Sequence, residues 1–182
     1  MNSEIISKIK DKLGFLLHNK EVIDLIVFGS ATKGKAIPRD IDVAILFYHP
    51  PTKELLNDIQ KMDQFHISIL TVKDFFINPG LLVNALLREG YSIKNKKSLS
   101  ETFKFSSRVL FTYNLSSLSA SNKVKVVNAL RGKKGKQGMV EKNNGEWIAN
   151  QVFTVPLPAD RLFEEFFNNF KMKYKKSYVL MH

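Results

Sequence analysis

The sequence has 182 residues and a mass of 20.8 kDa, and it is 44% apolar and 25% charged, which is the composition of one globular domain or two small ones. It contains no cysteine, which excludes a disulfide framework, a thiolate zinc site and a cysteine nucleophile, so we expect an intracellular, cytoplasmic location. The longest apolar runs, 25–28 and 43–47, are far shorter than the roughly 20 residues of a membrane span. The first residues, 1–12, mix acids and bases, which is not typical of a secretory signal.

The charge is large and unevenly distributed. With 28 basic and 17 acidic residues the formal net charge is +11. Residues 1–97 hold 14 basic and 11 acidic residues, whereas 98–182 hold 14 basic and 6 acidic residues. This excess of positive charge predicts a polyanionic partner, nucleic acid before membrane, although a lysine-rich surface also serves solubility alone.

Hydrophobic periodicity predicts alternating helices and strands in the first half of the chain. Apolar residues at helical spacing predict an amphipathic helix over 3–18, and short β-branched or alternating runs predict strands. Thr52 is a suitable N-cap, and Gly90 is suited to end a helix. The predicted elements are strand 22–28, strand 40–47, a helix after Thr52, strand 65–72 and helix 81–89.

The amino-acid composition changes near Ser98, where a serine-rich, basic region begins. This change predicts two domains, 1–98 and 99–182. The fold class is therefore α/β (α+β), with a small α+β C-terminal region. The predicted elements are strand 108–113, a helix capped by 119–122, a basic loop 131–138 (RGKKGKQG), a β-hairpin 139–148 around Asn143-Asn144-Gly145, strand 151–155, helix 159–170 with Leu162, Phe163, Phe166, Phe167 and Phe170 buried, and strand 172–180 with solvated lysines at 171, 173, 175 and 176.

The clearest signal for function is the stretch 28–46, FGSATKGKAIPRDIDVAIL. Its first strand ends in Gly29-Ser30, and a small turn with free backbone N–H groups beside a hydroxyl can hold phosphate oxygens closely. Asp40 and Asp42 stand at positions i and i+2 of the next strand, so we expect both carboxylates on one face. Two such carboxylates need a cation between them, and Mg²⁺ with a nucleotide triphosphate meets that need.

The pattern resembles the signature of the polymerase-beta-like nucleotidyltransferase superfamily: an apolar residue, Gly-Ser, a spacer, and Asp-x-Asp within an apolar strand. Gly34 fits the minimal nucleotidyltransferase type of this loop, and the resemblance covers about residues 5–99. Lys33, Lys35 and Arg39 in the spacer would add positive charge near the phosphates.

The resemblance implies a mixed nucleotidyltransferase sheet backed by helices in residues 1–98. It also implies that Gly29 and Ser30 bind a nucleotide triphosphate such as ATP, and that Asp40 and Asp42 ligate Mg²⁺ or Mn²⁺. The implied reaction moves a nucleoside monophosphate to an acceptor hydroxyl and releases pyrophosphate.

The family usually carries a third carboxylate on the following strand, and this chain has none there. Residues 64–70 read QFHISIL, in which His66 and Ser68 share a face, so we expect one of them in the place of the carboxylate. A histidine there can act as a general base or a weak metal ligand, or it can be a polar residue in a site that no longer does chemistry. Whether the protein is an enzyme stays open at this point.

The basic half contains the candidate nucleic-acid contacts. Arg131, Lys133, Lys134 and Lys136 lie in one glycine-punctuated segment, where cations can bind phosphates and release counterions. Trp147 can stack on unpaired bases, but a core position is the more common role for such a residue. The predicted partner is RNA or DNA.

The leading hypothesis is a nucleotidyltransferase. A second is a catalytically degenerate nucleotidyltransferase-like module that binds nucleic acid or a protein partner. A third is the antitoxin role that some minimal nucleotidyltransferases play toward a helical partner protein, against which the long C-terminal region counts. The acceptor hydroxyl, whether RNA, DNA, protein or small molecule, is not determined by the sequence.

Overall fold

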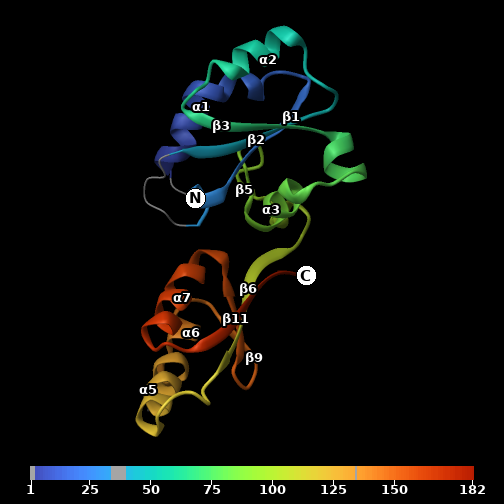
Figure 1. The fold of residues 1–182 in the computed structure, drawn as a ribbon. Helices are drawn as coiled ribbons and strands as arrows, with labels where there is room; N and C mark the ends of the chain where they lie inside the picture. Colours follow the sequence, from blue (N-terminus) through green and yellow to red (C-terminus); the bar gives the residue numbers. More distant parts are fainter. Residues whose placement is uncertain (1–2, 34–39, 134) are drawn as a thin grey trace. The chain divides into compact units, whose positions relative to one another are not determined.

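The computed structural model describes residues 3–33, 40–133 and 135–182, and the chain forms two compact units, Met1–Phe105 and Ser106–His182 (Figure 1). The structure thus divides the chain after Phe105, whereas the composition change pointed to residue 98. Leu99 explains the difference, because its side chain is buried with Leu86 in the core of the first unit. In the described part of the chain, no helix combines the length and the apolar character needed to cross a membrane.

The first unit contains the helices and strands that the sequence predicts, together with several short elements that it does not. Thr52 caps the second helix, because its Oγ1 accepts a hydrogen bond from the backbone N–H of Leu55. The elements are α1 (Ser3–Leu17), β1 (Val22–Phe28), the 3₁₀ turn η1 (Gly29–Ala31), β2 (Ile41–Phe47), α2 (Lys53–Gln60), β3 (Phe65–Thr71), the π-helical turn η2 (Lys73–Ile77), α3 (Leu81–Glu89), β4 (Tyr91–Ser92), β5 (Lys97–Ser98) and α4 (Leu99–Thr102).

Within residues 3–33 and 40–105, five strands form one mixed sheet in the order β3-β2-β1-β4-β5. Strands β2 and β3 are parallel, since α2 carries the chain back between them, and the other neighbours are antiparallel. This confirms the expected mixed sheet backed by helices.

Helices cover both faces of this sheet (Figure 1). On one face, Val43 and Ile45 of β2 are buried against α1 and α2. On the other face, Ala44 and Leu46 are buried against α3. Burial on both sides explains why β2 is almost continuously apolar after Asp42, and it leaves polar side chains only at the end where the strand begins.

Asp24 ties β1 to the segment after β4. Its carboxylate is buried and accepts hydrogen bonds from the Ser92 hydroxyl and from the backbone N–H groups of Leu25 at 2.8 Å and Lys94 at 3.1 Å. Burial raises the pKa of Asp24, and the hydrogen bonds from Ser92, Lys94 and Leu25 oppose this rise.

The second unit is an antiparallel sheet with helices packed on one face. Within residues 106–133 and 135–182, its larger sheet has four strands in the order β11-β6-β10-β9, and a separate two-stranded hairpin joins β7 to β8. The elements are β6 (Ser106–Asn114), α5 (Ala120–Arg131), β7 (Gly132–Lys133), β8 (Lys136–Gln137), α6 (Met139–Lys142), β9 (Glu146–Ala149), β10 (Val152–Pro156), the 3₁₀ turn η3 (Leu157–Ala159), α7 (Asp160–Asn169) and β11 (Lys173–Met181).

The core of the second unit is aromatic. Phe111 and Phe153 of the sheet pack against Phe163 and Phe167 of α7, and all four side chains are fully buried. The prediction that Leu162 is buried is wrong: its side chain is 44% exposed, because the buried face of α7 follows residues 163 and 167. Phe166 and Phe170 are only partly buried.

Lys176 corrects the expectation that all lysines of the last strand are solvated. Its register partner is Phe111, so it lies on the helix-covered face of the sheet. There its Nζ is 3.0 Å from Asp160 Oδ2 and 2.8 Å from Glu164 Oε1. Burial lowers the pKa of Lys176, but hydrogen bonds to Glu164, Tyr178 and Asp160 outweigh this and raise it above its ordinary value.

The predicted hairpin over 139–148 is also wrong. Residues Met139–Lys142 form the short helix α6, because Val140 is fully buried and Gly145 N–H returns to its carbonyl at 2.8 Å. Asn143 closes the same turn by donating from Nδ2 to the Met139 carbonyl at 2.8 Å. The hairpin instead joins β9 to β10, and the basic segment predicted as a loop contains the β7–β8 hairpin.

Candidate active site

The predicted phosphate turn lies directly against the second aspartate. β1 ends at Phe28, and Gly29 begins η1 with φ +72°, a left-handed conformation that side chains rarely adopt. A Cβ atom at residue 29 would overlap Oδ2 of Asp42. Thr32 closes the turn, since its hydroxyl donates to the Gly29 carbonyl at 2.9 Å. Glycine is therefore required here both by backbone geometry and by the neighbouring carboxylate.

Asp42 lies between two neighbouring strands. Its register partners are Phe28 on β1 and His66 on β3. Its side chain is partly exposed, whereas Ile41 before it is buried and Asp40 is exposed. The alternation places the buried side chain between two accessible carboxylates, as expected for a strand that begins at the edge of the core.

The register distinguishes His66 from Ser68 in the third-carboxylate position. His66 is paired with Asp42, and its Nδ1 is 3.5 Å from Asp42 Oδ1. Ser68 is paired with Ala44, farther along the strand from the aspartates. The imidazole is largely exposed, so it is accessible to a ligand bound over Asp42.

Lys33 follows the turn and is held by a carboxylate. Its Nζ lies 2.8 Å from Oε2 of Glu89, which also lies 3.4 Å from Arg88 Nη2. Ser30 accepts a backbone hydrogen bond from Lys33 N–H at 3.3 Å. Lys33 and Ser30 are therefore both placed at this turn. Gly34, Lys35 and Arg39, which the sequence adds to the same loop, lie outside the described residues.

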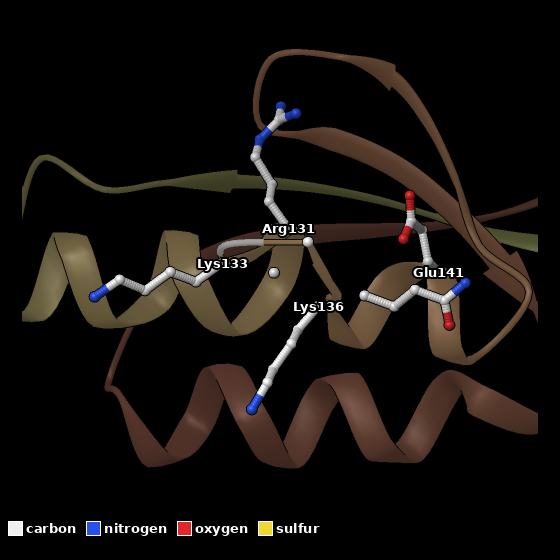
Figure 2. Close-up of a pocket in the computed structure, with 7 residues that line it drawn as sticks. Arg131, Lys133, Lys136 and Glu141 are labelled. Atoms are coloured by element: carbon white, nitrogen blue, oxygen red, sulfur yellow. The ribbon is translucent and has the colours of Figure 1, made fainter.

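The β7–β8 hairpin of the second unit lines a pocket of about 280 Å³ (Figure 2). Arg131, Lys133, Lys136 and Glu141 line it, and the three basic side chains are exposed. In Figure 2 the Arg131 side chain points up, whereas the Lys133 and Lys136 side chains point to the left and down. Divergent cations match an extended polyanion better than one small anion. Lys134, the fourth predicted contact, lies outside the described residues.

Trp147 is a packing residue. The ring centroids of Trp147 and Phe153 lie 5.2 Å apart, and the Arg131 guanidinium lies 3.8 Å from the centroid of the Trp147 ring. The indole thus lies between the core and a cation, which agrees with a core position rather than with a base-stacking surface.

A comparison with protein families decides the family of the chain. The sequence model described as "Nucleotidyltransferase domain" matches residues 6–108, which is more than half of the chain and includes η1, β2 and β3. The chain belongs to the nucleotidyltransferase domain family. A search of curated proteins found no match.

The candidate metal ligands of this nucleotidyltransferase domain are Asp40 and Asp42. Among the described residues, no group of three or more histidine, cysteine, aspartate or glutamate side chains is placed to hold a metal ion. Asp40 and Asp42 nevertheless supply carboxylate oxygens, which a hard cation prefers, and a bound triphosphate brings further oxygens of the same kind. The donor set fits a magnesium ion that binds together with its nucleotide.

Glu89 has a partner that its sequence position does not indicate. It contacts its neighbour Arg88, but its shorter contact is with Lys33, which follows the Gly29 turn. The available signal was a glutamate that ends an amphipathic helix immediately before a glycine. That signal cannot identify the distant lysine.

Proposed function

We propose that this protein transfers a nucleoside monophosphate from a nucleotide triphosphate to an acceptor hydroxyl with the help of Mg²⁺. The observation that carries the proposal is the contact between the Gly29 turn and the Asp42 carboxylate, with His66 on the other side of Asp42, in a chain of the nucleotidyltransferase family. A phosphate held at the turn lies next to the carboxylate that shares its cation.

Each group has a role in this reaction. The Gly29-Ser30 turn and Lys33 bind the β- and γ-phosphates, and Asp40 and Asp42 hold the magnesium ion. When bound, the ion neutralises charge on the phosphates and on the departing pyrophosphate. The acceptor oxygen attacks the α-phosphorus in line with the bond to pyrophosphate, which breaks as the new P–O bond forms.

His66 lies where a proton from the acceptor hydroxyl can be received. Its Nδ1 lies 3.5 Å from Asp42 Oδ1, and its ring is largely exposed. A carboxylate beside an imidazole fixes the orientation of the ring. We assign His66 the general-base role that a third carboxylate has in relatives.

The test incubates the protein with each α-³²P nucleotide triphosphate, Mg²⁺ or Mn²⁺, and RNA, DNA or protein acceptors. We expect metal-dependent label that Asp40→Ala/Asp42→Ala fails to transfer while keeping its circular dichroism spectrum. Asp58→Ala is the control, because Asp58 is an exposed carboxylate of α2 that pairs with Lys61 just after the helix. Transfer that survives the double substitution contradicts the proposal.

We further propose that the second unit binds nucleic acid, RNA or DNA, through the β7–β8 hairpin. The exposed cations Arg131, Lys133 and Lys136 around an open pocket support this role. The protein has a single tryptophan, and Trp147 contacts Arg131, so its fluorescence reports binding at the hairpin. Titration with single-stranded and duplex RNA and DNA should change this fluorescence at low salt, and an unchanged signal together with absent filter binding contradicts the role.

The catalytically degenerate module is the other candidate, because the chain has histidine where relatives have an acid. It is distinguished by intact nucleotide binding with no transfer to any acceptor. In that case the nucleic-acid or protein partner becomes the function of the molecule, and His66 has no chemical role.

A further inference from the structure

Glu89 is a buried carboxylate beside the proposed phosphate turn. Its side chain is only 4% exposed, and its Oε2 lies 2.8 Å from Lys33 Nζ and 3.4 Å from Arg88 Nη2. A buried charge is costly unless it is paired and hydrogen-bonded, so this glutamate requires its basic partners.

The backbone of Glu89 is firmly placed. Glu89 is the last residue of α3, and Gly90 after it lies so close to β1 that a Cβ atom would come within 2.8 Å of Ile26 Cγ2 and overlap the Leu86 carbonyl. The Gly90 N–H donates to that carbonyl at 2.7 Å, and the Gly90 carbonyl accepts from Leu99 N–H at 2.7 Å. The end of α3 that carries the carboxylate therefore packs against β1, the strand that ends in the phosphate turn.

Lys33 differs from Glu89 in the burial of its side chain and in the placement of its backbone. It follows η1 outside any helix or strand, and its long side chain is 36% exposed. A lysine in such a position has many accessible rotamers, and fixing them costs conformational entropy. The contact with Glu89 fixes the ammonium group before a ligand arrives, while part of the side chain stays accessible.

We infer that Glu89 is a positioning residue that holds the Lys33 ammonium group at the Gly29 turn, where it binds the β- and γ-phosphates of the nucleotide. The inference rests on the proposed function and adds a residue to the same site. A pre-positioned cation contributes more to binding than a mobile one, because less freedom is lost when the ligand binds.

The experiment measures binding by isothermal titration calorimetry, with Mg²⁺ present, of ATP, of AMP and of inorganic tripolyphosphate. The variants are Glu89→Gln, Lys33→Gln and the double variant, each checked by circular dichroism. Tripolyphosphate tests the phosphate contacts independently of the base. Asp160→Asn is the matched control, because Asp160 is a carboxylate with only 9% of its side chain exposed that pairs with a lysine in the second unit, 3.0 Å from Lys176 Nζ.

We expect Glu89→Gln to weaken binding of ATP and tripolyphosphate by about tenfold, the range of one charge-assisted contact, and to change AMP binding little. Because Glu89 acts through Lys33, the double variant should lose no more affinity than Lys33→Gln alone. Asp160→Asn should leave all three affinities unchanged. If Glu89→Gln does not fold, Glu89→Asp, which withdraws the carboxylate from Lys33, should show an intermediate loss.

Additive losses in the double variant, or an unchanged preference for triphosphate over AMP in a folded Glu89 variant, would overturn the inference. The failure of the proposed function looks different. In that case the wild-type protein itself binds neither ATP nor tripolyphosphate, or its binding does not depend on Asp40 and Asp42.

Discussion

The two units of this protein hold their charges in different ways. In the first unit the charged groups of the site come from strand ends and a helix end, and they have close partners: Asp42 has His66, and Glu89 has Lys33 and Arg88. In the second unit the basic side chains of the β7–β8 hairpin are exposed and point in different directions (Figure 2).

The difference matches the two kinds of ligand that we propose for the two units. A compact triphosphate with its metal ion needs groups that converge on one point, and rigid strands hold such groups in place. An extended nucleic-acid backbone needs only cations spread along its path. Each of the following experiments tests one side of this comparison.

The largest effect is expected from Gly29→Ala. The substituted side chain would require positive φ and would overlap the Asp42 carboxylate. We expect nucleotide transfer to fall about 100-fold, because a displaced Asp42 carboxylate no longer holds the metal ion that stabilises the transition state. We also expect the free energy of unfolding to fall by about 1–2 kcal/mol. Assays of labelled nucleotide transfer and urea denaturation measure the two effects.

Gly14→Ala is the control for that substitution. Gly14 lies inside α1, and a Cβ there would have no neighbour within 4 Å. It should raise the free energy of unfolding by about 0.5–1 kcal/mol and leave transfer unchanged. Equal effects of the two substitutions would contradict the special role of the turn.

His66→Asp places an acid beside Asp42, on the strand where the family resemblance implies a third carboxylate. We expect the affinity for Mg²⁺ in the presence of ATP to rise about tenfold, because a carboxylate is a better ligand than imidazole for this ion. His66→Asn is the control, since it is neutral at the same position. Metal titration of the transfer rate measures the effect, and equal behaviour of the two variants would remove His66 from the site.

In the second unit, Lys133→Gln/Lys136→Gln should weaken binding of single-stranded RNA by about fivefold. The slope of log affinity against log salt should fall by roughly one for each phosphate that the variant no longer neutralises. Lys53→Gln/Lys61→Gln, on and just after α2 of the first unit, removes the same amount of charge and should change neither quantity much. Filter binding at several salt concentrations distinguishes the hairpin from the general charge of the protein.

The smallest effect concerns Asp24. Because burial raises its pKa above the ordinary 3.8, the folded state keeps this proton to higher pH than the unfolded state does. Its contribution to stability is therefore present at low pH and is lost as the pH rises above 3.8. Relative to Asp24→Asn, the wild-type protein should lose stability as the pH rises from 3.8 through the folded-state pKa.

Hydrogen exchange of the β1 amides, measured against pH in both proteins, checks this prediction. Lys176 provides the contrast in the second unit. Its raised pKa predicts stability that persists through neutral pH and is lost only in alkali. An identical pH dependence of wild type and Asp24→Asn would contradict the burial argument.

The sequence by itself determined the larger helices and strands, and it gave the location of the proposed nucleotide site. Strand burial follows from apolar runs such as 41–47, and a Gly-Ser turn before Asp-x-Asp has few other uses. It did not identify the helix at Met139–Lys142, because Asn-Gly favours a hairpin locally while burial of Val140 favours a helical turn.

Only the tertiary structure decided which residues meet. The sequence left His66 and Ser68 equivalent, and the register of β3 against β2 separates them by pairing His66 with Asp42. The packing of α3 on β1 likewise brings Glu89 to Lys33, which lies far from it in the sequence. Periodicity specifies the face of an element, but the position of one element along its neighbour depends on the packing of the whole core.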